Sequence, residues 1–334
     1  MATSIKDVAR EANVSIATVS RVLNNVDVVN EDTKKKVLEA IEKLDYRPNI
    51  VARSLKTQKT KTIGIIIPDI SNQIYPEVVR GAEDVANIYD YNIILCNTDL
   101  DPQKEMEYLR VLGEKMVDGV IYISNSLEKD VVKTIKNSNM PLVLIETNGK
   151  ESDFPSVIID NKQAAIDAVN YLIQKGNKRI AYIGTEKDAV NASAIRYKGY
   201  RAALEENKFE HNEELTYFCK YSLKADDGYN AMNEILQKTK EIDAVFCAND
   251  EIAMGAINAL RDNNISVPKD VDVMGFNDTY GAAIFYPKLT TISQPLYDMG
   301  SVATRMLIKK INKEPLDKEL FILPYELIER DSCK

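Results

Sequence analysis

The sequence predicts an α/β protein that begins with a small all-helical module. In the first 44 residues, apolar side chains recur with the spacing of helices. From Thr62 onward, short apolar runs alternate with amphipathic stretches, as in folds built from alternating strands and helices. At 334 residues, the chain is long enough for a small module and one or two α/β domains.

The first apolar face belongs to a short helix. Ile5, Val8, Ala9 and Ala12 recur at i, i+3, i+4 and i+7, and an Asn-Val pair then breaks the pattern. Ser15 can start a second helix by accepting a backbone N–H. Two short helices joined by a tight turn form a helix-turn-helix, whose second helix enters the major groove of DNA.

The second helix has an outer face suited to that groove. Val19, Val22 and Leu23 face inward, which leaves small, polar and singly basic side chains outside. Such a face enters a groove about 12 Å wide without steric conflict. The DNA contacts predicted on this helix are Ser15, Ile16, Ala17, Thr18, Ser20, Arg21 and Asn24.

The division of charge places DNA on the N-terminal module alone. Residues 1–61 carry 12 Lys and Arg against 8 Asp and Glu, a net charge of +4. The whole chain has 43 against 51, so the remainder carries 31 against 43, a net charge of −12. A basic segment attracts the phosphate backbone and an acidic body disfavours it.

A third helix and a basic linker follow. The third helix runs from Asn30, its N-cap, to Leu44, and its inward positions are Thr33, Val37, Leu38, Ile41 and Leu44. Residues 47–61 contain five basic and no acidic side chains. Pro48 fits the first turn of a helix that is too short to be stable without a partner.

The body of the chain reads as parallel sheets covered by helices. The strand candidates are 63–67, 92–96, 119–123, 142–145, 157–159, 179–183, 244–247 and 271–276. Ligands bind beyond the carboxyl ends of such strands. The polar residues there are Asp69, Ser71, Asn72, Tyr75, Asn125, Thr147, Asn148, Asp160, Asn249, Asp250, Asn277 and Asp278, which could bind a sugar or a purine or could serve only as helix caps and turns.

Several segments resemble one family over nearly the whole chain. IKDVAREANVSIATVSRVLNN, RPNIVARSL, IGIIIPDISNQIYPEVVRGAED, RYKGYRAAL, FCANDEIAMGAINAL and DVMGFND are similar to the lactose-repressor/galactose-repressor family of bacterial transcription regulators. ATVSRV, YNIILCN and QPLYDMGSVATRMLIKK are most similar to its catabolite control protein A group.

This resemblance implies the domain organisation. It implies a headpiece at 1–46, a hinge at 47–61, and a periplasmic-binding-protein-like core at 62–334 made of two Rossmann-like subdomains. The first subdomain would comprise 62–161 and 291–323, and the second 162–290 and 324–334. The chain would cross between the subdomains near Asn161, Thr291 and Leu323.

The same resemblance implies roles for hinge and cleft residues. Two hinge helices would pair in the minor groove and insert Leu55, supported by Ala52, between base pairs. Asn49, Arg53 and Lys56 would be further DNA contacts. In members that bind sugars or purines, residues matching Arg196, Asn249 and Asn277 contact the ligand, so the expected effector cleft comprises Asp69, Asn72, Tyr75, Asn148, Asp160, Arg196, Asn249 and Asn277.

The sequence leaves two candidate effectors open. The catabolite control group binds the phosphocarrier HPr, phosphorylated on serine, through a surface whose counterpart here would be Tyr89, Tyr297, Asp298, Met299, Val302 and Arg305. Arg305 could bind the phosphoserine through its guanidinium. A small sugar or sugar phosphate in the cleft is the alternative, and phosphorylated HPr is modestly favoured.

Other classes of protein are disfavoured. His211, the sole histidine, lies in a polar stretch without a nucleophile motif, so we expect a surface residue and no enzyme. The four cysteines lack metal-ligand spacing, so we expect reduced structural thiols and neither metal nor cofactor. No apolar run suits a signal peptide or a membrane span, which indicates a cytoplasmic protein. Helix-turn-helix readers of this type bind paired half-sites, so we expect a homodimer on a near-palindromic operator. By the same resemblance, the absence of the long leucine-heptad tail that makes the lactose repressor a tetramer argues against a tetramer.

Overall fold

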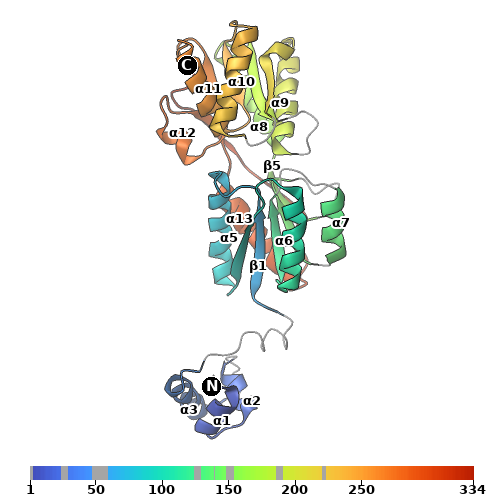
Figure 1. Ribbon diagram of the computed structural model, residues 1–334, viewed down its shortest axis with the longest axis vertical. Helices are drawn as coiled ribbons and strands as arrows, with labels where there is room; N and C mark the ends of the chain where they lie inside the picture. Colours follow the sequence, from blue (N-terminus) through green and yellow to red (C-terminus); the bar gives the residue numbers. More distant parts are fainter. Residues whose placement is uncertain are drawn as a thin grey trace. The chain divides into compact units, whose positions relative to one another are not determined.

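The computed structural model describes residues 3–23, 29–46, 59–123, 129–138, 140–147, 154–185, 191–219 and 223–334 (Figure 1). The chain divides into two compact units, residues 1–60 and 61–334. Some predicted site residues lie outside the described ranges, namely Asn24, Asn49, Ala52, Arg53, Leu55, Lys56, Asn125 and Asn148.

The first unit contains the expected short helices. These are α1 (Ile5–Glu11), α2 (Ile16–Leu23) and α3 (Glu31–Lys43). Asn30 caps α3 as predicted, because its side chain accepts the N–H of Thr33 at 2.8 Å. The buried core is Val8, Ala9, Ala12, Val19, Val22, Val37, Ala40 and Tyr46.

One inward position predicted in α3 is wrong. The side chain of Leu38 is 50% exposed, whereas Val37 is fully buried. Successive helical residues are rotated by about 100°, so two neighbours cannot both lie at the centre of one face. The core-facing residues after Val37 are Ala40, Ile41 and Leu44.

The second unit contains two six-stranded sheets, one in each subdomain. The first has the order β11-β5-β4-β3-β1-β2, and all its pairings are parallel. Its strands are β1 (Thr62–Ile67), β2 (Asn92–Asn97), β3 (Gly119–Ile123), β4 (Leu142–Ile145), β5 (Ser156–Ile159) and β11 (Leu320–Leu323). Its helices are α5 (Ile74–Ile88), α6 (Pro102–Glu114), α7 (Lys129–Ser138) and α13 (Leu296–Ile311).

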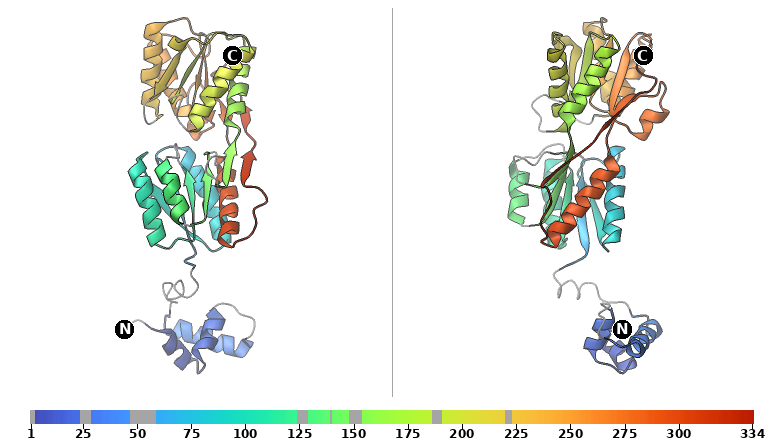
Figure 2. Two further views of the ribbon diagram at one scale, coloured as in Figure 1. Left: turned by 90° about the vertical axis from the view of Figure 1, so that its right-hand side faces the viewer. Right: turned by 180° about the vertical axis from the view of Figure 1, so that it is seen from behind.

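Alternation along β1 sorts its isoleucines between two cores. Ile63, Ile65 and Ile67 pack with α5 and α13, while Ile66 packs with α6 and α7 on the other face. This follows from the strand period of two. Figure 2 shows α13, in orange-red, lying across the sheet beside the cyan α5.

The second sheet has the order β12-β10-β9-β8-β6-β7. All its pairings are parallel except that of β12 with β10. Its strands are β6 (Ile180–Thr185), β7 (Thr216–Cys219), β8 (Ala244–Cys247), β9 (Asp272–Asn277), β10 (Thr290–Ser293) and β12 (Glu326–Ile328). Its helices are α8 (Asn161–Gln174), α9 (Ala192–Glu206), α10 (Ala225–Lys238), α11 (Asp250–Asp262) and α12 (Tyr280–Ile284), with a short 3₁₀ helix at Glu213–Leu215.

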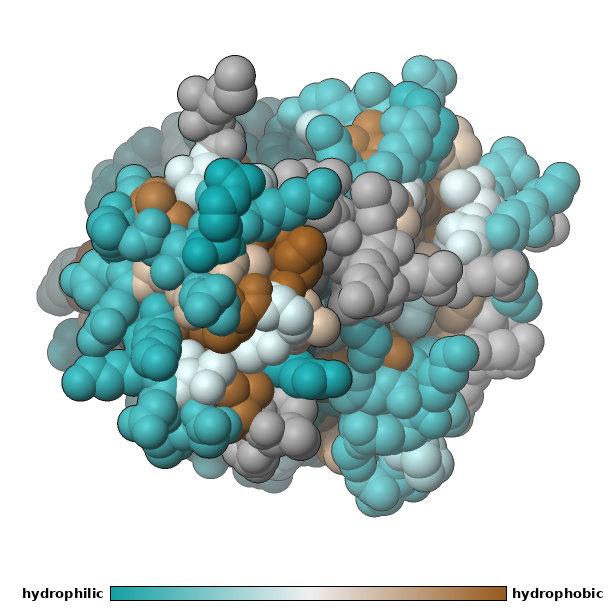
Figure 3. All heavy atoms as spheres, turned by 90° about the horizontal axis from the view of Figure 1, so that it is seen from below, coloured by the Kyte–Doolittle hydropathy of each residue, from teal (hydrophilic) through white to brown (hydrophobic). Residues whose placement is uncertain are grey.

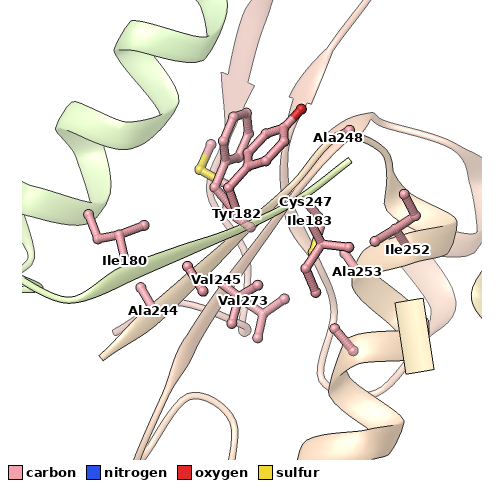
Figure 4. Close-up of a cluster of buried hydrophobic side chains, with 14 of the residues drawn as sticks. Ile180, Tyr182, Ile183, Ala244, Val245, Cys247, Ala248, Ile252, Ala253 and Val273 are labelled. Carbon is pink, nitrogen blue, oxygen red and sulfur yellow. The ribbon is translucent and has the colours of Figure 1, made fainter. Parts of the chain in front are cut away.

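The core of this subdomain is apolar on both faces of its central strands. Figure 4 shows Ile180, Tyr182 and Ile183 of β6 beside Val245 of β8 and Val273 of β9. Residues on strands buried on both faces read as continuous apolar runs, which is why β6, β8 and β9 could be predicted from the sequence.

The chain passes three times between the subdomains. It leaves the first sheet after β5, returns between β10 and α13, and leaves again between β11 and β12. Strand β10 stays in the second sheet through Ser293, two residues beyond the expected crossing at Thr291.

Helices α5 and α13 touch backbone to backbone. A Cβ atom built on Gly81 would lie 1.9 Å from the carbonyl oxygen of Tyr297, and one on Gly300 would lie 1.9 Å from that of Val78. Only glycine allows this approach, because it has no Cβ. The contact fixes which side of α13 faces solvent.

The surface is mainly hydrophilic where Figure 3 shows it, with hydrophobic residues in patches between charged and polar ones. No helix in the described ranges is both long and apolar enough to cross a membrane. Cys96, Cys219, Cys247 and Cys333 are all buried free thiols.

Candidate functional site

The second helix of the N-terminal unit presents an exposed face. Ile16 is 45% exposed, and Ala17 and Arg21 are also exposed, while Val19 and Val22 are buried beneath them. The periodicity that separates these two faces is therefore present in the structure. This face carries one guanidinium and otherwise small or apolar side chains.

Two hydroxyls organise the start of this helix. The Ser15 Oγ accepts the backbone N–H of Thr18 at 3.1 Å and lies 2.9 Å from the Thr18 hydroxyl. Ser15 therefore acts as the predicted cap, which satisfies a backbone donor in the first turn.

A second candidate site is a cavity between the two subdomains of the core. It has room for about 60 Å³ of water-sized solvent, is open to solvent, and lies beyond the carboxyl ends of strands from both sheets. Its polar lining includes six predicted cleft residues: Asp69, Asn72, Tyr75, Arg196, Asn249 and Asn277. Asp160 is not among the lining residues; it caps α8 by accepting the N–H of Gln163 at 3.0 Å.

Arg196 is the most firmly held side chain of this cavity. Its Nε donates to Asn161 Oδ1 at 2.8 Å, and an Nη donates to the carbonyl of Ala248 at 2.7 Å. The guanidinium lies 3.7 Å from the centre of the Phe276 ring. The residue is only 5% exposed, so its orientation is set by the protein before any ligand arrives.

Glu146 is a cavity residue that the sequence prediction missed. It directly follows β4 with a positive φ of 63°, and its side chain is 12% exposed. Its Oε1 lies 3.7 Å from the remaining Nη of Arg196 and accepts a hydrogen bond from Gln294 at 3.4 Å. Its position at the end of β4, directly before the predicted residues 147 and 148, is the sequence signal that could have identified it.

Burial perturbs two ionisable groups in this cavity. It lowers the pKa of Arg196 by disfavouring the charged form, an effect that Glu146 opposes. Burial also raises the pKa of Tyr75, and the charge of Glu146 raises it further. Tyr75 therefore presents a protonated phenol to the cavity.

The two cavity asparagines also have structural roles. Asn249 caps α11 by accepting the N–H of Ile252 at 2.8 Å, and it donates to the carbonyl of Leu223 at 2.9 Å. Asn277 has a φ of 114° and accepts from Gln294 at 2.7 Å. Helix capping and turn formation therefore explain, in part, why asparagines occur at these strand ends.

Neighbouring carboxylates serve the fold. Asp250 is fully buried and accepts hydrogen bonds from the N–H and hydroxyl of Thr279 and from the hydroxyl of Thr291. Asp278 forms a 2.6 Å salt bridge with Arg330. The described residues contain no group of three side chains suited to a metal ion.

A third candidate site is the exposed side of α5 and α13. Tyr89 is 44% exposed and Tyr297 is 40% exposed, and Asp298 and Arg305 are exposed as well. Val302 is half-buried against the core of the first sheet.

Met299 was predicted to lie on this surface, and this prediction is wrong because the side chain is fully buried. It lies on the stripe of α13 that includes Leu296, Ala303 and Leu307, at i, i+3, i+7 and i+11. The helical period therefore turns Met299 toward the core and leaves Tyr297, Asp298 and Arg305 outside.

Two family profiles match the chain. One, described as "Bacterial regulatory proteins, lacI family", matches residues 4–49. The other, described as "Periplasmic binding proteins and sugar binding domain of LacI family", matches residues 60–331. Together they span the helical unit and most of the two-subdomain core.

Individual proteins are similar over their full length. The HTH-type transcriptional regulator RegA of Clostridium acetobutylicum is 66% identical over 337 residues, covering 100% of both chains. Catabolite control protein A of Priestia megaterium is 43% identical over 335 residues, also covering 100% of both. The crystal structure of the lac repressor dimer bound to operator and an anti-inducer superposes with a TM-score of 0.89 at 23% identity, covering 99% of each chain, and this shows a shared fold.

Proposed function

This chain belongs to the LacI family of DNA-binding transcriptional regulators, and from that premise we propose that it is a dimeric repressor of carbon-source or catabolite genes whose corepressor is serine-phosphorylated HPr. Its relatives are named as transcriptional regulators, not as enzymes. The observation that carries the proposal is the exposed guanidinium of Arg305 on α13, the helix that also exposes Tyr297 and Asp298.

In this function the exposed face of α2 reads base edges. Ile16, Ala17 and Arg21 contact bases in the major groove, while Ser15 and Thr18 anchor the phosphate backbone. Ser20, and Asn24 outside the described ranges, are further DNA contacts in this proposal. Two copies bind the two halves of a near-palindromic operator.

The linker contributes a second set of contacts. In the proposed complex residues 49–55, which lie outside the described ranges, pair with their copy in the minor groove, and Leu55 is inserted between base pairs with Ala52 supporting it. Asn49, Arg53 and Lys56 contact the backbone. Release of this helix from DNA is the step that an effector controls.

Phosphorylated HPr binds the exposed side of α5 and α13. A phosphoserine carries nearly two negative charges and three acceptor oxygens, which a guanidinium binds with two parallel hydrogen bonds. No salt bridge to Arg305 occurs within the described ranges, so the guanidinium is available to the phosphate. Tyr89, Tyr297 and the half-buried Val302 supply apolar contact around it.

The test is operator binding, measured by fluorescence anisotropy with and without serine-phosphorylated HPr. Arg305→Ala should abolish the stimulation by HPr while leaving basal operator affinity unchanged. Arg261→Ala is the matched control, since Arg261 is an exposed arginine on α11 of the other subdomain. Intact stimulation in Arg305→Ala, or its loss in Arg261→Ala, contradicts the proposed corepressor surface.

A sugar or sugar phosphate in the cavity is the second candidate effector. It is favoured by the lining of Tyr75, Asn249, Asn277 and Arg196, which can bind closely spaced hydroxyls. Tyr75→Phe is the sharper test than Arg196→Ala, because Arg196 also stabilises the fold through Asn161 and Ala248. A sugar response that Tyr75→Phe weakens, in protein unresponsive to HPr, supports this alternative.

A further inference from the structure

Asp250 is a fully buried carboxyl group in the first turn of α11, in the second subdomain. Its hydrogen-bond donors are neutral: the N–H and the hydroxyl of Thr279, at 2.7 and 3.0 Å, and the hydroxyl of Thr291, at 2.6 Å. No cation forms a salt bridge with it among the described residues. A buried carboxyl group with neutral partners keeps its proton more readily than one in water.

One segment that holds Asp250 also contacts the first subdomain, namely the turn into α12. Thr279, which donates to Asp250, is the N-cap of α12. Two residues later the N–H of Gly281 donates to Oε1 of Gln73 at 3.3 Å, and Gln73 is the N-cap of α5 in the first subdomain. A movement that withdraws Thr279 from Asp250 therefore disturbs this contact between the subdomains.

The second such segment is the end of β10, where the chain crosses back to the first subdomain. Thr291 of β10 donates to Asp250. Three residues later the amide of Gln294 donates to Glu146 of the first subdomain at 3.4 Å. Water can reach Asp250 when the turn or β10 moves away, and either movement disturbs a contact between the subdomains.

The charged and titratable groups that face Asp250 come from other elements. Arg196 of α9 favours the ionised form. Asp278, which follows β9, disfavours it, but Asp278 is paired with Arg330 at 2.6 Å. Cys247 of β8 is a buried thiol whose pKa is raised, so it is neutral. Burial has the largest effect, and it raises the pKa of Asp250 from 3.8 to about 7.

We propose that a proton on Asp250 locks the two subdomains in the arrangement seen in this structure, and that loss of this proton releases them. The neutral carboxyl group is stable in its buried position, whereas the carboxylate favours an arrangement in which water reaches it. Ionisation therefore weakens the contacts of Gly281 with Gln73 and of Gln294 with Glu146. An effector that prefers one arrangement then binds with an affinity that depends on pH.

The experiment is single-molecule energy transfer between dyes on Lys133→Cys in α7 and Glu234→Cys in α10, two exposed positions in different subdomains. The four native cysteines are buried, and excess unlabelled protein keeps labelled protomers apart in any oligomer. The population of the released arrangement rises by up to about tenfold per pH unit while Asp250 is protonated only in the locked one. This population should therefore rise at least tenfold between pH 5.5 and 8.0.

Asp250→Asn cannot ionise, so its released population should stay low over the whole range. His211→Gln is the matched control, because His211 is the sole histidine and lies outside this cluster, between α9 and β7. It should keep the wild-type response. A wild-type protein without a response, an equal response in folded Asp250→Asn, or loss of the response in His211→Gln overturns the proposal.

Thr291→Val replaces Asp250→Asn if circular dichroism shows that the latter does not fold. Removing a donor to the carboxylate should raise the pKa of Asp250 further, so the released population should continue to rise at higher pH than in the wild type. An unchanged pH profile in Thr291→Val contradicts the proposal. The measurement uses neither operator nor HPr, so its outcome is independent of the proposed function.

Discussion

The ammonium group of Lys224 lies 3.1 Å from the carboxylate of Asp69, so one salt bridge joins the two subdomains at the rim of the cavity. Lys224 immediately precedes α10 of the second subdomain, and Asp69 follows β1 of the first. The Lys224 Nζ also donates to the Ser71 hydroxyl at 3.1 Å. Burial alone would raise the pKa of Asp69, but hydrogen bonds from Ser71 and Lys224 outweigh it and lower that pKa.

This bridge should contribute little to stability. The Lys224 side chain is 47% exposed, and solvated ion pairs are worth about 0.2 to 1 kcal/mol. A double-mutant cycle with Asp69→Asn and Lys224→Met, followed by urea unfolding, should give a coupling energy in that range. The exposed Lys309–Asp317 pair, within the first subdomain, is the control. A coupling near 3 kcal/mol would show instead that the bridge holds the cavity closed by itself.

Arg21→Ala should reduce operator affinity by about 1 to 3 kcal/mol and relax specificity at one base pair of each half-site, since a guanidinium reads a guanine edge with two hydrogen bonds. Anisotropy titrations with operator and with random DNA at one salt concentration measure this. Arg110→Ala, an exposed arginine on the acidic body, should change neither affinity. An undiminished preference for operator in Arg21→Ala refutes the assigned role.

Gly300→Ala should destabilise the protein by roughly 1 to 3 kcal/mol, because the new Cβ would lie 1.9 Å from the carbonyl oxygen of Val78 and force α5 and α13 apart. Gly113→Ala is the matched control. Gly113 lies within α6, and a Cβ there meets nothing within 4 Å, so alanine should stabilise by up to about 1 kcal/mol. Equal unfolding midpoints in urea for the two variants would contradict the packing argument.

Asp250 should make stability depend on pH between about 4 and 7. Burial raises its pKa from 3.8 to about 7, against the hydrogen bonds from Thr291 and Thr279. Between these pH values the Asp250 carboxyl is ionised in the unfolded chain but protonated in the folded protein. The free energy of unfolding therefore falls as pH rises and levels off above pH 7.

Asp250→Asn removes this titration while its amide can still bond to both threonines. Urea titrations from pH 4 to 8 should therefore show that the unfolding free energy of the wild type decreases relative to that of the variant as pH rises. A pH-independent difference would count against a protonated Asp250.

The strands that were not predicted from the sequence were missed for one physical reason. Eight apolar runs were predicted and are confirmed as strands, most of them buried on both faces. Strands β7, β10, β11 and β12 were not predicted: each has three or four residues, and β7, β11 and β12 lie at sheet edges with partly exposed side chains. Their pairing comes from distant segments, as when Thr291 meets Ile328, which no local pattern records.

Position in the sequence, directly after a strand, was a better guide to the cavity residues than the type of side chain. Asp69, Tyr75 and Asn277 follow strands in the sequence and line the cavity, because parallel strands end at one edge. Glu146 was missed because its role depends on Arg196, which approaches from another subdomain. Met299 was wrongly placed because a motif was carried over whole, although helical phase alone points it inward.

The threefold passage of the chain between the subdomains has a consequence during protein synthesis. The first subdomain begins at Thr62, yet α13 covers the Ile63 and Ile65 face of its sheet, and β11 completes one edge. A nascent chain on the ribosome therefore leaves the part of this isoleucine face that α5 does not cover exposed until residues beyond Leu296 have left the exit tunnel. Polypeptides that terminate earlier should be substrates for chaperones and proteases, although they contain the entire DNA-reading unit.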